Sequence, residues 1–165
     1  MSCLQNNNLA HRLCVMALAT ALTFLMTVIP KIPIPLGYAH LGDAVVFLLP
    51  FFLKRKDAML AAAVGSALAD FLGGFPIWVL PTLFIKAGMA YATSLFVQKS
   101  PQFALIGCIL ASLILTAGYT VFGALIYGSL ETGLLQIPGL LAEGAVNTAA
   151  AFILLIVLRN MHMIK

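Results

Sequence analysis

Four ionisable side chains lie within or at the ends of long apolar runs and are the residues best placed to do chemistry: Asp43, Asp70, Lys86 and Glu143. A charged side chain is costly in hydrocarbon, so such residues pair with one another or line a polar cavity. Asn147 follows Glu143 by four positions, which places both on one face of a helix. We expect these polar groups to turn toward the protein interior.

Aromatic and hydrogen-bonding residues are expected near the same depth as these charges: Tyr38, His40, Trp78, Tyr119 and Tyr127. A few polar groups among apolar walls are typical of a small-molecule site, so we interpret the whole set as a substrate-binding pocket. Two simpler interpretations stay open. Lys86 could pair with Asp70 or Glu143 only to lock the helices together, and Trp and Tyr are common at membrane interfaces.

Composition indicates which elements position these residues. Hydrophobic residues make up 62% of the 165 positions and charged residues only 8%, too few polar groups to cover a water-soluble globule. Because a membrane span needs about 20 apolar residues, this length accommodates about six helices. We predict an all-α integral membrane protein, with residues 1–165 forming a single transmembrane domain in the lipid bilayer. The net charge of +4 forms no basic patch with interleaved aromatics, which argues against nucleic-acid binding.

Prolines, glycines and a charge cluster divide the chain into its predicted helices. A proline-rich stretch from Pro30 ends the first helix, and residues 73–74, both glycine, end the third. Asp57 follows the basic run 54–56 and is placed to cap the third helix. The six helices are predicted at about 9–29, 39–53, 57–72, 80–97, 102–127 and 134–158.

Basic residues indicate the orientation, because cytoplasmic connections carry an excess of Lys and Arg. With the N-terminus inside, the cytoplasmic basic residues are Arg12, Lys54, Arg55, Lys56, Lys99, Arg159 and Lys165, and only Lys31 lies outside. Both termini are predicted to be cytoplasmic, so the loops at 30–38, 73–78 and 128–133 face outward. At 1.5 Å per residue, Lys86 lies about 9 Å below the outer end of its helix and Glu143 about 10–14 Å. The charges therefore lie in the outer half.

Small residues recur at helical spacing on two predicted helices and permit close helix packing. Ala61, Gly65 and Ala69 on the third helix are interpreted as an internal contact. Ala17 and Ala21 on the first helix could instead present a surface to another membrane subunit.

Three segments carry a resemblance to a known family: residues 32–43 (IPIPLGYAHLGD), 65–74 (GSALADFLGG) and 81–86 (PTLFIK). Together they resemble the substrate-binding S components of energy-coupling factor (ECF) vitamin transporters. The resemblance extends over nearly the whole chain in size, number of helices, orientation and loop placement. Within that family the form Tyr-Ala-His-Leu-Gly-Asp is most similar to the branch assigned to hydroxymethylpyrimidine or pyridoxine-type vitamin B6 compounds.

The resemblance implies a six-helix subunit in a prokaryotic plasma membrane that binds a vitamin at its outer side, under the first and third outer loops. Ala17 and Ala21 would dock it onto a transmembrane coupling subunit carried by two cytoplasmic ATPases. The chain has no Gly-x-x-x-x-Gly-Lys-[Ser/Thr] motif, so ATP would be used by those partners and no cofactor is expected here. Riboflavin or pantothenate are the alternative vitamins.

Two other classes of function would also use buried polar groups. An intramembrane enzyme could use Asp70, Glu143 and His40 as acid or base, but no nucleophile is paired with a base and no metal-ligand motif occurs. We therefore expect neither catalysis nor a bound metal. A solitary secondary carrier would also contain buried carboxylates, but the two halves of the chain show no convincing internal repeat.

Overall fold

The computed structural model describes residues 9–34, 37–96 and 101–161. The six long helices are α1 (Leu9–Val28), α2 (Gly42–Phe52), α3 (Arg55–Leu72), α4 (Val79–Ser94), α5 (Pro101–Tyr127) and α7 (Ile137–Asn160). The shorter elements are β1 (Ile32–Ile34), β2 (Gly37–Ala39), the 3-10 turn η1 (Pro76–Trp78) and α6 (Leu130–Leu134). Each long helix begins and ends within three residues of a predicted span, and the predicted all-α fold of six long helices is confirmed.

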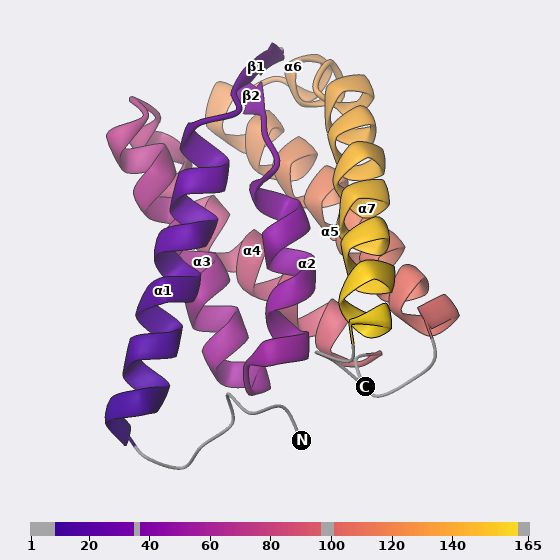
Figure 1. The fold of residues 1–165 in the computed structure, drawn as a ribbon. Coiled ribbons are helices and arrows are strands. Elements are labelled where there is room, and N and C mark those ends of the chain that lie inside the picture. The colour runs from indigo at the N-terminus through magenta and orange to yellow at the C-terminus, as the bar shows by residue number, and fades with distance from the viewer. Residues whose placement is uncertain (1–8, 35–36, 97–100, 162–165) are drawn as a thin grey trace.

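The long helices form one bundle (Figure 1). In it α2 packs against α1, α3, α4 and α7, while α5 lies between α4 and α7. The β1–β2 hairpin and α6 lie at one end of the bundle, and the start of α1 and the end of α7 lie at the other. Of the basic residues predicted to be cytoplasmic, Lys99 and Lys165 lie outside the described residues.

Apolar side chains cover the outside of the bundle, with Leu18, Leu125 and Ile153 each more than 60% exposed. Such a surface matches lipid rather than water. Within the described residues, three stretches are long and apolar enough to cross a membrane: 9–28, 103–127 and 130–160. The helices between them in the chain are shorter or more charged.

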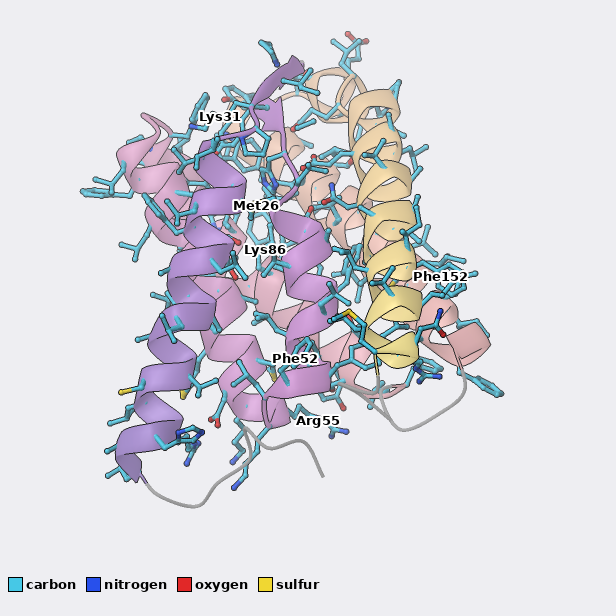
Figure 2. All side chains as sticks on the ribbon, in the orientation of Figure 1. Met26, Lys31, Phe52, Arg55, Lys86 and Phe152 are labelled. Atoms are coloured by element: carbon cyan, nitrogen blue, oxygen red, sulfur yellow. The ribbon has the colours of Figure 1, made fainter. Side chains whose placement is uncertain are left out.

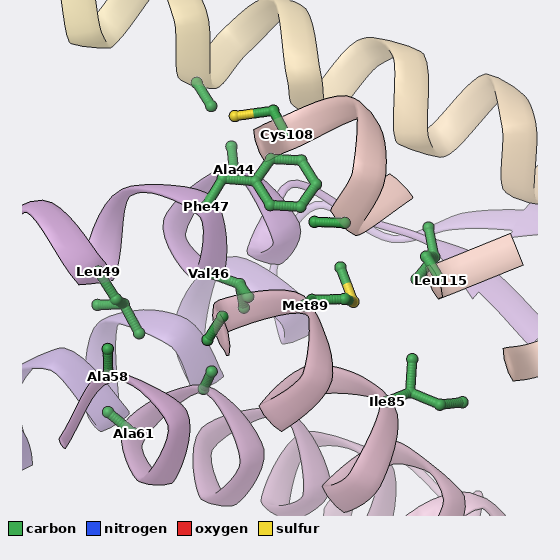
Figure 3. Close-up of a cluster of buried hydrophobic side chains, with 14 of the residues drawn as sticks. Ala44, Val46, Phe47, Leu49, Ala58, Ala61, Ile85, Met89, Cys108 and Leu115 are labelled. Atoms are coloured by element: carbon green, nitrogen blue, oxygen red, sulfur yellow. The ribbon is translucent and has the colours of Figure 1, made fainter. Parts of the chain in front are cut away.

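Apolar side chains ranging in size from alanine to phenylalanine fill the centre of the bundle (Figure 3). Val46 and Phe47 of α2 and Met89 of α4 are completely buried there. Between α1 and α3, a Cβ added to Gly65 would lie 2.7 Å from the carbonyl oxygen of Thr20. The small residues of α3 therefore serve internal packing, as predicted.

Three local expectations differ from the structure. Asp57 was predicted to cap α3, but that helix begins at Arg55, and Asp57 in its first turn pairs with Arg12 of α1, whose Nε lies 2.6 Å from Oδ2. This carboxylate therefore pairs with the charged side chain of Arg12 on the neighbouring helix and does not accept a free backbone N–H as a helix cap would. The predicted loop 30–38 contains all but the last residue of the antiparallel hairpin, in which Pro33 lies opposite Tyr38. The predicted turn 128–133 contains most of α6, capped by Ser129.

A candidate ligand pocket at the hairpin end

A cavity lies between the hairpin and the upper halves of the helices, and it contains about 440 Å³ of non-protein space including its open mouth. Ten residues line it: Tyr38, His40, Asp70, Phe75, Trp78, Lys86, Tyr119, Gln136, Leu140 and Glu143. Seven of the nine predicted substrate-binding residues are therefore brought together, and Asn147 and Tyr127 are not among them.

The lining residues come from most parts of the chain. The first and second outer loops contribute two each: Tyr38 and His40 from the first, Phe75 and Trp78 from the second. Lys86, Tyr119 and Glu143 each lie more than one turn below the outer end of their helix, whereas Asp70 and Leu140 lie in the outermost turn of theirs. Figure 2 shows Lys86 between Lys31 at the hairpin end and Arg55 at the opposite end of the bundle.

Lys86 forms an ion pair with Asp43, in the first turn of α2. Both side chains are at most 1% exposed. The alternative in which Lys86 pairs with Asp70 or Glu143 is therefore wrong, because α2 brings a closer carboxylate to the ammonium. The Lys86 ammonium also lies 5.4 Å from the ring centre of Tyr119, within reach of a cation–π contact.

Asp70 accepts hydrogen bonds from two hydroxyls. The phenol of Tyr38 donates to Oδ1 at 2.9 Å, and the hydroxyl of Thr82 donates to Oδ2. Thr82 is also 2.8 Å from the hydroxyl of Tyr119. Burial, and next the charge of Asp70, raise the pKa of Tyr38, so its phenol stays protonated and able to donate. This chain of hydroxyls joins the hairpin, α3, α4 and α5 at one wall of the pocket.

Glu143 and Asn147 bind the backbone where the hairpin enters α2. Glu143 Oε1 accepts the backbone N–H of His40 at 3.1 Å, and Asn147 Oδ1 accepts that of Ala44 at 2.8 Å. Asn147 Nδ2 donates to the carbonyl oxygens of His40, at 2.7 Å, and of Glu143, at 2.9 Å. The predicted ligand contact of Asn147 is therefore replaced by a structural one, since both its amide hydrogens are used.

The imidazole of His40 is neutral at physiological pH. Its Nδ1 accepts the backbone N–H of Gly42 at 3.1 Å, which requires an unprotonated nitrogen. Burial lowers the pKa of His40 to about 4. The 3.4 Å approach of Nδ1 to Glu143 Oε1 is therefore not an ion pair.

Aromatic rings form the upper walls. Tyr38 packs against Phe75 with ring centres 5.3 Å apart, and Trp78 against Tyr119 at 5.4 Å. The indole Nε1 of Trp78 is buried without a hydrogen-bond partner in the described part of the chain. Tyr127 is 45% exposed and is not among the lining residues, and its ring centre lies 6.3 Å from that of Trp78.

One cluster has the side-chain types of a metal site. His40, Asp43 and Glu143 could each offer a ligand atom, and these atoms lie within 4.8 Å of one another. The ammonium of Lys86 already contacts Asp43, however, so a cation is supplied there by the protein itself.

Sequence reasoning missed three lining residues, Phe75, Gln136 and Leu140. Two of them could have been found by extending the polar face of the last helix backward, since positions 136, 140, 143 and 147 recur at helical spacing. Phe75 lies in a loop, where no periodicity locates a side chain.

Ala17 and Ala21, the predicted docking residues, are exposed on α1. Of all residues in that helix, only Thr23 and Thr27 are buried. A long surface of α1 is therefore open to lipid or to another membrane subunit.

Comparisons with known proteins agree with this geometry. The family model described as ECF-type riboflavin transporter, S component, matches residues 7–160. The thiamine precursor transporter HmpT of Lactococcus lactis subsp. cremoris (strain MG1363) is 28% identical over 131 residues, 78% of this chain and 75% of that protein. An uncharacterized protein of Pyrococcus woesei is 32% identical over 106 residues, 62% of this chain and 71% of that protein.

A solved S component of a bacterial ECF transporter superposes with a TM-score of 0.75. The match covers 92% of this chain and 97% of that one at 20% sequence identity. At this identity the likeness is one of fold.

Proposed function

This chain belongs to the family of S components of ECF-type riboflavin transporters, and we propose that its ligand is a small heteroaromatic vitamin precursor of the hydroxymethylpyrimidine or vitamin B6 type. The family places it in the membrane as a subunit for uptake of a vitamin or vitamin precursor, and as a transport protein rather than an enzyme. The ligand would bind in the pocket from the outer side.

One observation carries the proposal: two carboxylates lie among aromatic rings in the pocket. Asp70 and Glu143 line the same cavity as Tyr38, Trp78 and Tyr119. A flat ring can stack on the aromatic side chains while its amino or hydroxyl groups donate to the carboxylates. Hydroxymethylpyrimidine has an amino group, a hydroxyl group and ring nitrogens in one small plane.

The balance of charge around the pocket favours the same class of ligand. Asp43, Asp70 and Glu143 are three carboxyl groups. Two ammonium groups face them: that of Lys86, paired with Asp43, and that of Lys31, 4.2 Å from the ring centre of Tyr38. Buried negative charge is stabilised by hydrogen-bond donors or by positive charge. A donor-rich or protonated ring satisfies this requirement, whereas the carboxylate of pantothenate would add to the negative charge.

Riboflavin is the second candidate, because the matching family model is described by that vitamin. The relative HmpT, described as a thiamine precursor transporter, supports the pyrimidine instead. The two ligands differ strongly in size, since riboflavin has three fused rings and a ribityl chain. Binding measurements therefore separate them directly.

Inward delivery would depend on a transmembrane coupling subunit and two cytoplasmic ATPases. The small exposed side chains of Ala17 and Ala21 would allow the coupling subunit to approach α1 closely. ATP would be bound by the partners, and this chain would need no cofactor.

The ligand is tested by mass spectrometry of small molecules that co-purify with the detergent-solubilised chain. Calorimetric titration with hydroxymethylpyrimidine, pyridoxine, riboflavin and pantothenate then ranks the candidates. We expect the pyrimidine or pyridoxine to bind at least about a hundredfold more tightly than pantothenate, because two donor bonds to carboxylates are at stake. Tight binding of riboflavin alone would overturn the proposal.

A second experiment separates an S component from a solitary carrier. The chain is reconstituted in liposomes with and without the coupling subunit and ATPases. Repeated uptake should require the partners and ATP. Sustained uptake by the chain alone would contradict the assignment of partners.

A further inference from the structure

The indole N–H of Trp78 is a buried hydrogen-bond donor in the wall of the pocket. Trp78 is only 4% exposed, and its Nε1 has no hydrogen-bond partner among the described residues. Most buried polar groups in proteins are paired, because an unpaired group has lost its bond to water and gained nothing in exchange. We propose that this N–H donates to an acceptor on the bound molecule, so that Trp78 selects ligands with a ring nitrogen or a carbonyl oxygen.

Aromatic and backbone contacts hold the indole in place. The ring centre of Trp78 lies 5.4 Å from that of Tyr119 and 6.3 Å from that of Tyr127. The backbone N–H of Trp78 donates to the carbonyl oxygen of Phe75 at 3.0 Å, within the turn η1. The indole therefore loses these contacts if it turns toward another acceptor. A donor that is already held in one orientation loses little further entropy when a ligand binds.

The neighbouring amide of Gln136 is used elsewhere. Its Nε2 donates to the carbonyl oxygen of Tyr119 at 3.5 Å. A Cβ added to Gly123 of α5 would lie 2.0 Å from this Nε2 and 3.5 Å from the ring of Trp78, so the amide and the indole both pack on the glycine. Because Trp78 lines the cavity, a bound molecule can supply the acceptor that the described residues do not.

The inference rests on the proposed function and adds an acceptor to the groups that the ligand needs. Asp70 and Glu143 accept hydrogen bonds, whereas an indole only donates. Hydroxymethylpyrimidine satisfies both, since its amino and hydroxyl groups donate and its ring nitrogens accept. Its carbocyclic analogue, 2-amino-4-methylbenzyl alcohol, has the same amino and hydroxymethyl groups on a ring without nitrogen. The pair of molecules therefore isolates the ring acceptor.

The hydrogen bond can be observed at the indole itself. Trp78 is the only tryptophan in the chain, so protein labelled with nitrogen-15 tryptophan gives one indole N–H signal in detergent. Hydroxymethylpyrimidine should move the indole proton downfield, as expected for a proton that enters a hydrogen bond. The carbocyclic analogue should not. Binding of hydroxymethylpyrimidine without a downfield shift would overturn the proposal.

The affinity test removes the N–H from the protein and its acceptor from the ligand. Biosynthetic replacement of Trp78 by benzothienylalanine keeps nearly the same shape and puts sulfur in place of the N–H. This replacement should weaken hydroxymethylpyrimidine binding about tenfold, as expected for one lost hydrogen bond, and should leave the affinity for the carbocyclic analogue unchanged. Equal losses for the two molecules would show that only ring packing has changed, and would overturn the proposal.

The empty protein provides the control for folding. Because no described residue accepts the indole N–H, the benzothienylalanine protein should unfold at a midpoint no lower than that of wild type, followed by circular dichroism in detergent. A lower midpoint would show that the N–H has a structural partner, and would contradict its role toward the ligand. This measurement does not depend on the identity of the ligand.

The outcomes distinguish this inference from the proposed function. If hydroxymethylpyrimidine does not bind, the assigned ligand is wrong, and the indole spectrum is recorded with riboflavin, whose ring nitrogens and carbonyl oxygens are also acceptors, and with the molecule that co-purifies. A downfield shift with either supports the indole as donor. If hydroxymethylpyrimidine binds and the indole proton does not move downfield, the assigned ligand stands and the role of the indole is wrong.

Discussion

Asn147 on α7 donates a hydrogen bond from Nδ2 to the backbone carbonyl oxygen of His40, 107 residues earlier in the chain, at 2.7 Å. Its Oδ1 accepts the backbone N–H of Ala44 at 2.8 Å. The side chain of Asn147 thus binds one backbone group just before α2 and another in its first turn. The pocket-lining residues next to it, His40 and Glu143, depend on that contact for their positions.

Asn147→Ala should therefore reduce both stability and ligand binding. The variant leaves the N–H of Ala44 and the carbonyl oxygen of His40 buried without this partner, at a cost of about 1–3 kcal/mol each. We expect a lower midpoint of thermal unfolding in detergent, followed by the fluorescence of Trp78. The control is Asn160→Ala, at the exposed end of α7. A full loss of binding at an unchanged midpoint would instead indicate direct ligand contact.

Lys86→Met should lower the free energy of unfolding more when it is made alone than when its partner Asp43 is replaced as well. Lys86→Met leaves the buried carboxylate of Asp43 uncompensated, which costs about 3–5 kcal/mol. The double variant Asp43→Leu/Lys86→Met removes both charges and should recover most of that loss. Thermal unfolding of both single variants and of the double variant gives the coupling energy. Additive effects would show that the two side chains do not stabilise each other.

Replacement of Gly65 and of Gly88 by alanine should change the stability of the protein in opposite directions. In Gly65→Ala the new methyl group would meet the backbone of α1, so we expect a loss of about 1–3 kcal/mol. In Gly88→Ala the methyl group would lie 3.6 Å from Ile114, an ordinary contact, and helix propensity should stabilise the chain by up to about 1 kcal/mol. Equal unfolding midpoints for the two variants would contradict the close α1–α3 packing.

Ala17→Leu and Ala21→Leu should impair uptake while leaving ligand binding intact. Both positions are exposed, so the added side chains find room in lipid but obstruct a close helix contact. The readouts are calorimetric affinity of the isolated chain and ligand uptake by cells. Ala149→Leu on the exposed face of α7 is the control. Normal uptake by all three variants would exclude this strip of α1 as the docking surface.

Much of the architecture follows from local properties of the chain. Apolar runs of sufficient length, ended by proline, glycine or charge, indicate the helices, because bilayer thickness and backbone hydrogen bonding leave few alternatives. The bias of Lys and Arg indicates the orientation. Helical spacing places Glu143 and Asn147 on one inward face, and the rise per residue places Lys86 at the same depth.

The tertiary structure alone decided which groups meet. Lys86 was within reach of several carboxylates by depth, and only the packing of α2 against α4 makes Asp43 its partner. Asn147 shares a face with Glu143, yet the start of α2 lies close enough to use its amide, which removes it from the pocket. Spacing along one helix determines a face, whereas the neighbour of that face depends on the rotation and contacts of every other helix.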